Sequence, residues 1–265
     1  MKIYQVDAFT DQPFRGNPAG VCMLDENRPD DWMQSLAAEM NCSETAFLLK
    51  QPGGPHLRWF TPKKEVSLCG HATLAAAHIL WETGAFQPAE QIVFTSQGGP
   101  LTIGRDGDWI EMDFPARQVS PAPPNPALNL ALDLSPTHTS KSANPKGDLY
   151  LLEVETEEIV SAIQPDFERL LASGARIAIV TSRTQTPGID FVSRFFAPAI
   201  GINEDPVTGS SHCYLAPYWG ARLNKQFLLG LQLSARQGLV GCIWQDERVI
   251  LRGKAVTVFK GELLV

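Results

Sequence analysis

Cysteine is scarce in this sequence, and the few that occur are not paired. The five cysteines are scattered through 265 residues, and no Cys-x-x-Cys motif is present. Neither a disulfide framework nor a metal site of the usual cysteine type is therefore indicated, and we expect no bound metal. Reduced thiols are typical of a cytoplasmic protein, which is the location we predict.

Basic charge and long apolar runs are also lacking. The 22 Lys and Arg residues are outnumbered by 29 Asp and Glu residues, which gives a formal net charge of −7. Nucleic acids and anionic membranes attract clustered Lys and Arg, and the pair Lys63-Lys64 is too short to form such a cluster. The longest apolar stretch, around residues 72–81, falls far short of the roughly 20 residues of a membrane span. The first residues alternate like a strand and do not resemble a signal peptide. We expect no nucleic-acid partner and no membrane association.

One pattern, in contrast, is present twice. Each copy has an Arg-aromatic-Phe-x-Pro segment, then a glutamate, then a glycine five positions after the glutamate, and later a Gln-Gly pair at nearly the same distance. The first copy comprises Arg58–Pro62, Glu65, Gly70 and Gln97-Gly98; the second comprises Arg194–Pro198, Glu204, Gly209 and Gln237-Gly238. These landmarks recur in the same order and predict two similar halves with an active site between them.

The hydrophobic patterning predicts strands around one buried helix in each half. A helix over residues 70–81 is apolar or small nearly all round, which is typical of a helix buried on all sides. The second begins near Gly209 and contains Pro217, which predicts a kink. We also predict a turn at residues 17–20 and a helix within residues 163–173.

The proline-rich stretch suggests the domain boundaries. We expect an N-terminal domain of residues 1–117 plus about 254–265, a C-terminal domain of residues 128–253, and a linker at residues 118–127. The C-terminal strand, around residues 255–259, would then return to the first half.

The two glycines begin helices, and a helix start is an anion-binding site. Its unpaired N–H groups and positive dipole end attract carboxylate or phosphate. Gly70 and Gly209 would let a ligand approach the backbone closely. Two such starts facing across an interdomain cleft would hold a small anionic substrate from both ends. The alternative is that each glycine only permits a sharp strand-to-helix turn.

Polar residues beside the two glycines are candidates for binding and chemistry. His71 can donate a hydrogen bond or act as an acid, Asp205 can hold an amine or take a proton, and Ser210 and its neighbour Ser211 can bind a carboxylate. The alternatives are structural: Asp205 can cap the helix or shape the turn before Pro206, and His71 can bond to the backbone of the first helical turn.

Glu44 is a further candidate, because it lies at the mouth of an apolar strand. Partial burial raises the pKa of a carboxyl group toward neutrality, which suits a general acid or base. A capping or surface role is the alternative.

Several motifs together resemble the phenazine biosynthesis PhzF-like family. They are Asn17-Pro18-Ala19-Gly20, Ser43–Phe47, Cys69–Thr73 and the long run Glu204–Trp219. The resemblance covers essentially the whole chain, in the order typical of the family. It implies an α+β, diaminopimelate epimerase-like fold, in which two pseudo-symmetric domains each wrap a β-barrel around a central helix and the site lies in the cleft between them. It also implies cofactor-independent isomerisation and a homodimer.

The resemblance further implies roles for individual residues. Glu44 would be the proton-shuttling acid/base; His71 and Asp205 would assist transfer or contact the substrate, as would Ser210, and Gly70 would give a backbone contact. Related epimerases and proline racemases use a cysteine at each helix start as a base. Here the repeat places Cys69 at the first start and Thr208 at the second, and threonine is no base near neutral pH. We interpret Cys69 as a small buried residue rather than a nucleophile.

The function predicted is an isomerase that moves a proton within a small carboxylated metabolite, with no cofactor. Two rivals stay open from the sequence. An amino-acid or hydroxy-acid epimerase or racemase could use Glu44 and Asp205 on opposite faces of one carbon. A non-catalytic binding protein could keep the same fold with a vestigial cleft.

Overall fold

The protein, seen in a computed structural model that describes residues 1–142 and 147–264, consists of two compact units. Unit 1 comprises Met1–Asp113 and Ile250–Val265, and unit 2 comprises Phe114–Val249. The proline-rich stretch of residues 118–127 belongs to unit 2, where it contributes a short strand and the start of a helix.

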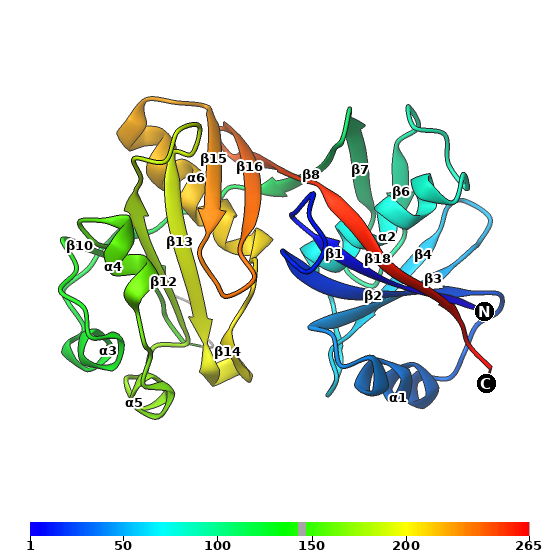
Figure 1. The fold of residues 1–265 in the computed structure, drawn as a ribbon, viewed down its shortest axis with the longest axis horizontal. Coiled ribbons are helices and arrows are strands. Elements are labelled where there is room, and N and C mark those ends of the chain that lie inside the picture. Colours follow the sequence, from blue (N-terminus) through cyan, green and yellow to red (C-terminus); the bar gives the residue numbers. More distant parts are fainter. Residues whose placement is uncertain (143–146, 265) are drawn as a thin grey trace. The chain divides into compact units, whose positions relative to one another are not determined.

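Unit 1 is a sheet with a helix on each face (Figure 1). The strands are β1 (Lys2–Ala8), β2 (Asn17–Leu24), β3 (Glu44–Leu49), β4 (His56–Phe60), β5 (Glu65–Val66) and β18 (Ala255–Glu262), in the order β18-β1-β2-β3-β4-β5. Helix α1 (Asp30–Met40) packs on β3 and β4, whereas α2 (Gly70–Glu82) packs on β1, β2, β3 and β18. An antiparallel set follows α2: β6 (Ile92–Phe94), β7 (Leu101–Asp106) and β8 (Trp109–Pro115). The antiparallel pairing of β18 with β1 returns the end of the chain to unit 1, as predicted.

Helix α2 is the core of unit 1. Its residues from His71 to Trp81 are buried with the exception of His78, which confirms the prediction from its apolar circumference. Many of them are alanines, and their small side chains let strands approach the helix closely.

The turn predicted at residues 17–20 is wrong. These residues form the first half of β2, paired with β1 from Asn17 opposite Ala8 to Gly20 opposite Gln5. Pro18 is tolerated because β3, on the other side of β2, begins its pairing only at Ala19. A proline at a strand end removes no hydrogen bond from a sheet interior.

Unit 2 repeats this plan around helix α6 (Gly209–Leu223). Its strands are β9 (Ser120–Pro121), β10 (His138–Ser142), β11 (Leu149–Glu153), β12 (Ile177–Arg183), β13 (Phe191–Ala197), β15 (Phe227–Gln232) and β16 (Gly238–Gln245), neighbours in the order β16-β15-β13-β12-β11-β10-β9. The short strand β14 (Ile202–Glu204) follows the 3-10 turn η1 (Pro198–Ile200) and pairs with β13. Helix α6 packs on β15 and β16 and runs through Pro217, while β17 (Arg248–Gly253) leads the chain back to unit 1.

Three short helices cover an apolar cluster of unit 2. They are α3 (Pro126–Leu132), α4 (Glu157–Ala162) and α5 (Phe167–Ala172). The helix predicted within residues 163–173 is confirmed as α5, and the residues 163–166 before it are not helical. Pro165 disfavours helical backbone before it, and the Asp166 carboxylate accepts from the Arg169 N–H and starts α5.

Two findings bear on the exclusions drawn from composition. All five cysteines are free and buried, as the reduced-thiol prediction requires. In the described ranges 1–142 and 147–264, the helices are too short or too polar to cross a membrane.

Candidate active site

The duplicated sequence pattern corresponds to a matching ion pair in each unit. In unit 1 the Nε and Nη2 of Arg58 donate to the two carboxylate oxygens of Glu65 at 2.7 and 2.8 Å. In unit 2 Arg194 makes the same forked contact with Glu204, also at 2.7 and 2.8 Å. Each pair ties a short strand, β5 or β14, to its neighbour a few residues before the helix begins. The two units therefore share the same ion pair in the segment that leads into α2 or α6.

Neither of these two helix starts is closed by a side-chain cap. The N-cap residues Cys69 and Thr208 make no capping hydrogen bond, whereas α3 and α5 are capped by Asn125 and Asp166. The first N–H groups of α2 and α6 therefore have no side-chain oxygen of the cap directed at them. A bound carboxylate can take that place.

The surroundings of Gly70 oppose the view that it serves only a sharp turn. Its backbone is outside the left-handed region, and apart from its chain neighbours and the backbone of its own helix no described atom lies within 4 Å of the place a Cβ would occupy. Neither strain nor crowding requires a glycine here. The missing side chain leaves open space against the start of α2.

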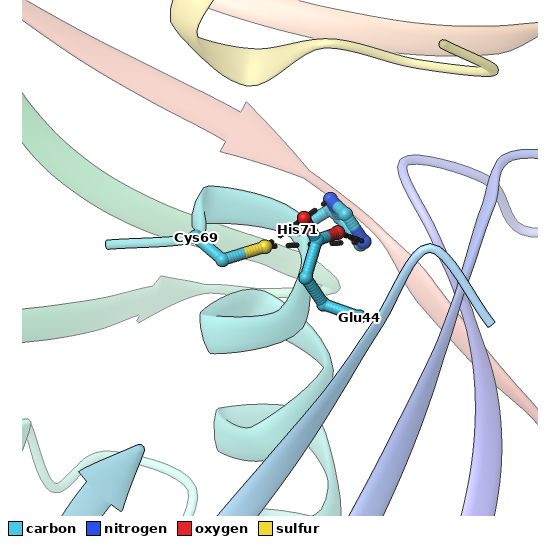
Figure 2. A group of neighbouring side chains, drawn as sticks. All are labelled: Glu44, Cys69 and His71. Atoms are coloured by element: carbon cyan, nitrogen blue, oxygen red, sulfur yellow. Dashed lines mark hydrogen bonds and ion pairs between the residues drawn. The ribbon is translucent and has the colours of Figure 1, made fainter. Parts of the chain in front are cut away.

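Alternation along β3 places the Glu44 side chain toward α2. Phe47 packs in the cluster beneath α1 with Met33, so residues 44, 46 and 48 face the other way. Oε2 of Glu44 lies 3.2 Å from Nε2 of His71, the second residue of α2. Only 13% of the Glu44 side chain and 8% of the His71 side chain are exposed. The structure thus brings together two of the three predicted catalytic residues, shown in Figure 2.

The imidazole of His71 is neutral at physiological pH. Burial disfavours the charged ring and lowers its pKa from 6.5 to about 4. A neutral imidazole has one N–H donor and one acceptor nitrogen. His71 can therefore hydrogen-bond to a carboxylate without forming a permanent ion pair.

Cys69 completes the cluster, and sequence reasoning gave it no part there. It is buried as predicted, but its Sγ also lies 3.5 Å from Nδ1 and 4.0 Å from Nε2 of His71 (Figure 2). The sequence signal for this contact is the position of Cys69 at the N-cap of α2, two residues before the histidine. Donor atoms of Glu44, Cys69 and His71 all lie within 4.8 Å of one another, a set that zinc could use. The Glu44 carboxylate adjoins Nε2, and the sulfur of Cys69 lies within 4.0 Å of both ring nitrogens.

The third predicted catalytic residue, Asp205, belongs to a separate polar cluster in unit 2. Its Oδ2 accepts from the Thr208 hydroxyl at 2.5 Å. Gln232, fully buried at the end of β15, accepts from the Thr208 N–H at 2.9 Å and donates to the Asp205 carbonyl at 2.7 Å. Gln232 was missed by sequence reasoning; its signal is a polar residue ending an apolar strand. The Gln232 amide holds the loop before α6 in place.

The predicted substrate contacts of unit 2 lie at the start of α6. Gly209 opens the helix, Ser210 is exposed, and Ser211 is buried with its hydroxyl donating to the Thr208 carbonyl at 2.7 Å. Of the two serines, Ser210 therefore has the hydroxyl open to solvent.

Strand register shows which residue occupies the place of Glu44 in unit 2. In unit 1, Phe60 of β4 pairs with Thr45 of β3, and Glu44 is the residue before Thr45. In unit 2, the equivalent Phe196 of β13 pairs with Ala178 of β12, and Ile177 is the residue before Ala178. At this position unit 1 therefore has a carboxylate and unit 2 an aliphatic side chain.

A buried histidine in α6 predicts acid sensitivity. Nδ1 of His212 lies 2.9 Å from the Thr208 carbonyl, and burial lowers its pKa from 6.5 to about 4. The unfolded chain then binds the proton first as pH falls, so stability present above pH 6.5 is lost between 6.5 and about 4. Over this pH range, His212 lowers the free energy of unfolding by about 3 kcal/mol.

The matching variant is His212→Asn, whose amide can donate to the same carbonyl. Urea unfolding measures the free energy of unfolding at neutral pH and at about pH 4. The decrease between these two pH values should be about 3 kcal/mol smaller in the variant than in the wild type. If the free energy of unfolding of His212→Asn depends on pH as steeply as that of the wild type, His212 is not the source of the acid sensitivity.

Comparison with known proteins agrees with this architecture. The family model described as phenazine biosynthesis-like protein matches residues 6–261. An uncharacterized isomerase of Halalkalibacterium halodurans is 48% identical over 266 residues, which cover 99% of this chain and 98% of that protein. The solved structure of a PhzF family protein of Enterococcus faecalis has a TM-score of 0.93 at 40% identity, covering 100% of this chain and 99% of that one.

A more distant structure extends the likeness in fold alone. A probable proline racemase of Agrobacterium radiobacter has a TM-score of 0.63 at 10% identity, over 100% of this chain and 93% of that one. Fold and relatives together define an isomerase-class protein with the fold of epimerases and racemases, and the predicted α+β, diaminopimelate epimerase-like fold is confirmed. The chain belongs to the phenazine biosynthesis-like, or PhzF-like, family.

Proposed function

We propose that this protein is a cofactor-independent isomerase that transfers a proton within a small carboxylated molecule, with Glu44 as the acid/base. The observation that carries the proposal is the contact of 3.2 Å between the Glu44 carboxylate and the neutral, buried His71, beside an uncapped helix start. The isomerase class of the relative from Halalkalibacterium halodurans supports it.

The proposed reaction uses one carboxylate twice. Ionised Glu44 removes a proton from a carbon that a neighbouring carbonyl or π-system makes acidic. The protonated Glu44 then returns this proton to another carbon on the same face of the molecule, which moves the double bond. The Nε2–H of His71 stabilises the ionised carboxylate before and after the cycle, and helix-start N–H groups near Gly70 stabilise the charge delocalised onto the substrate.

The asymmetry of the repeat favours a single shuttle over a pair of matched bases. Ile177 occupies the place of Glu44 in unit 2, and Thr208 the place of Cys69. Neither residue can accept a proton near neutral pH. The chemistry is therefore assigned to the cluster of unit 1.

Within the proposal, the cluster of unit 2 has a binding and assisting role. Asp205 is a carboxylate held rigidly by Thr208, which suits it to hold a substrate amine or to exchange a proton with the substrate. The hydroxyl of Ser210 and the backbone N–H groups at Gly209 and Ser211 are proposed as contacts for a carboxylate.

The test is solvent isotope incorporation with the purified protein. Incubated in deuterium oxide with a panel of small unsaturated carboxylic acids, the wild type should yield a product with a moved double bond and deuterium partly incorporated. Mass spectrometry and NMR locate the label. Deuterium only at the original carbon, with inverted configuration, would identify an epimerase instead. Ligands that raise the melting temperature without any exchange would identify a binding protein.

A further inference from the structure

The side-chain amide of Gln232 lies against the loop that leads into α6, and its orientation is determined by two backbone groups. Its Oε1 accepts from the Thr208 N–H at 2.9 Å, and its Nε2 donates to the Asp205 carbonyl at 2.7 Å. One partner can only donate and the other can only accept, so the amide fits in one way round. In this orientation Nε2 also lies 3.2 Å from the hydroxyl oxygen of Thr208.

The orientation of the amide determines the hydrogen bonds of the Thr208 hydroxyl. Because Nε2 can only donate, the hydroxyl oxygen accepts from it. The single hydrogen of the hydroxyl is then directed to Oδ2 of Asp205, 2.5 Å away. Such a short distance is typical of a hydroxyl that donates to an ionised carboxylate. The three side chains therefore form a chain of hydrogen bonds that runs from Gln232 through Thr208 to Asp205.

We propose that Gln232 is a positioning residue, which directs the hydroxyl hydrogen of Thr208 at Asp205 and so fixes the direction of this carboxylate at the start of α6. The inference rests on the proposed function only in that Asp205 is the acid which contacts the substrate there. Gln232 is fully buried and Thr208 is 6% exposed, so water competes little for these bonds. Each donor in such a chain polarises the next and strengthens its bond.

The repeat shows that this chain belongs to one unit. Counted back from the glycine that opens each central helix, Asp205 corresponds to Val66 and Thr208 to Cys69. A valine side chain cannot accept a hydrogen bond, so the chain would have no end point in unit 1. The amide, the hydroxyl and the acid therefore occur together in unit 2, as expected if the first two groups serve the third.

The direct test is the titration of Asp205, followed by carboxyl NMR in protein labelled with ¹³C-aspartate, with Asp205→Asn to assign the signal. Thr208→Val has nearly the shape of threonine and removes the hydroxyl that stabilises the ionised carboxylate. The midpoint of the titration should therefore rise by about one pH unit or more. Thr208→Ser keeps the hydroxyl and should titrate as the wild type does. Gln232→Met removes the amide donor and should raise the midpoint by less than Thr208→Val does.

A double-mutant cycle tests whether Gln232 acts through Thr208. In the Thr208→Val background, Gln232→Met should have little further effect on the titration of Asp205. The matched control is Thr181→Val, which removes a buried hydroxyl of unit 2 that donates to the Val192 carbonyl, and it should leave the titration unchanged.

Two results would overturn the inference: an unchanged titration in a folded Thr208→Val, or an effect of Gln232→Met that persists in full without the hydroxyl. If Gln232→Met does not fold, the side-chain amide signals of Gln232 decide instead. One of its two hydrogens should move upfield in Thr208→Val, because it loses its acceptor, and two unchanged signals would refute the chain.

Kinetics separate this inference from the proposed function. With a substrate in hand, Thr208→Val should lower kcat/KM about tenfold, the equivalent of one hydrogen bond to a charged group, and Thr208→Ser should restore it. If the titration result holds but no exchange activity is found, the positioning of Asp205 stands and the isomerase proposal fails. If exchange is found while Asp205 titrates independently of Thr208, the reverse is true.

Discussion

Replacing Glu44 by glutamine is expected to lower turnover at least about 100-fold and to abolish deuterium incorporation from solvent. The amide has nearly the shape of the carboxylate and its oxygen can still accept from Nε2 of His71, so the local packing is retained. It cannot accept a proton from carbon. Loss of a general base costs between about 10² and 10⁴ in rate, and here one group would serve both transfer steps.

The matched control is Glu82→Gln. Glu82 lies at the other end of α2 and also contacts a histidine, with Oε2 3.7 Å from Nε2 of His78. Its replacement changes the same charge and should leave turnover unaltered. Wild-type exchange in Glu44→Gln would refute the shuttle, and equal losses in both variants would indicate a general effect of charge.

Replacing Arg194 by alanine is expected to lower the free energy of unfolding by about 3 kcal/mol or more. Its side chain is only 10% exposed, and besides Glu204 it donates from Nη1 to the Ile163 carbonyl at 2.7 Å. The substitution strands a carboxylate that is 21% exposed and removes the donor from this carbonyl. Urea unfolding monitored by tryptophan fluorescence measures the loss.

Two comparisons make this prediction specific. Arg169→Ala removes an exposed ion pair with Asp166 and should cost less than about 1 kcal/mol. Arg58→Ala removes the equivalent fork of unit 1, where both partners are more exposed, and should fall between the two. A loss at Arg194 no larger than that at Arg169 would show that the forked pair adds little to stability.

The sequence predicted the large features of the molecule because they are encoded locally. An apolar circumference identified the buried helices, and the repeated Arg, Glu and Gly landmarks correspond to matching ion pairs and helix starts. The predictions that failed depended on context. Asn17–Gly20 has the composition of a turn, but a neighbouring strand on only one side accommodates its proline.

The candidate site was predictable in part for a related reason. Glu44 and His71 lie on different elements, and the resemblance to a family, rather than local pattern, linked them. The contact of Cys69 with the ring depends on side-chain direction at an N-cap, which spacing alone does not give. Gln232 acts from a strand more than twenty residues beyond the loop it holds, and the equivalence of Ile177 with Glu44 needs strand register.

The five buried cysteine thiols allow local unfolding of this protein to be measured by their rate of modification. A thiol reagent added to the native protein can react only when the surrounding structure opens, so the rate of modification measures how often it does. Cys22, Cys42 and Cys69 lie in unit 1, and Cys213 and Cys242 in unit 2. Mass spectrometry distinguishes the five sites, so the opening rates of the two units can be measured separately in one experiment on the protein without substitutions.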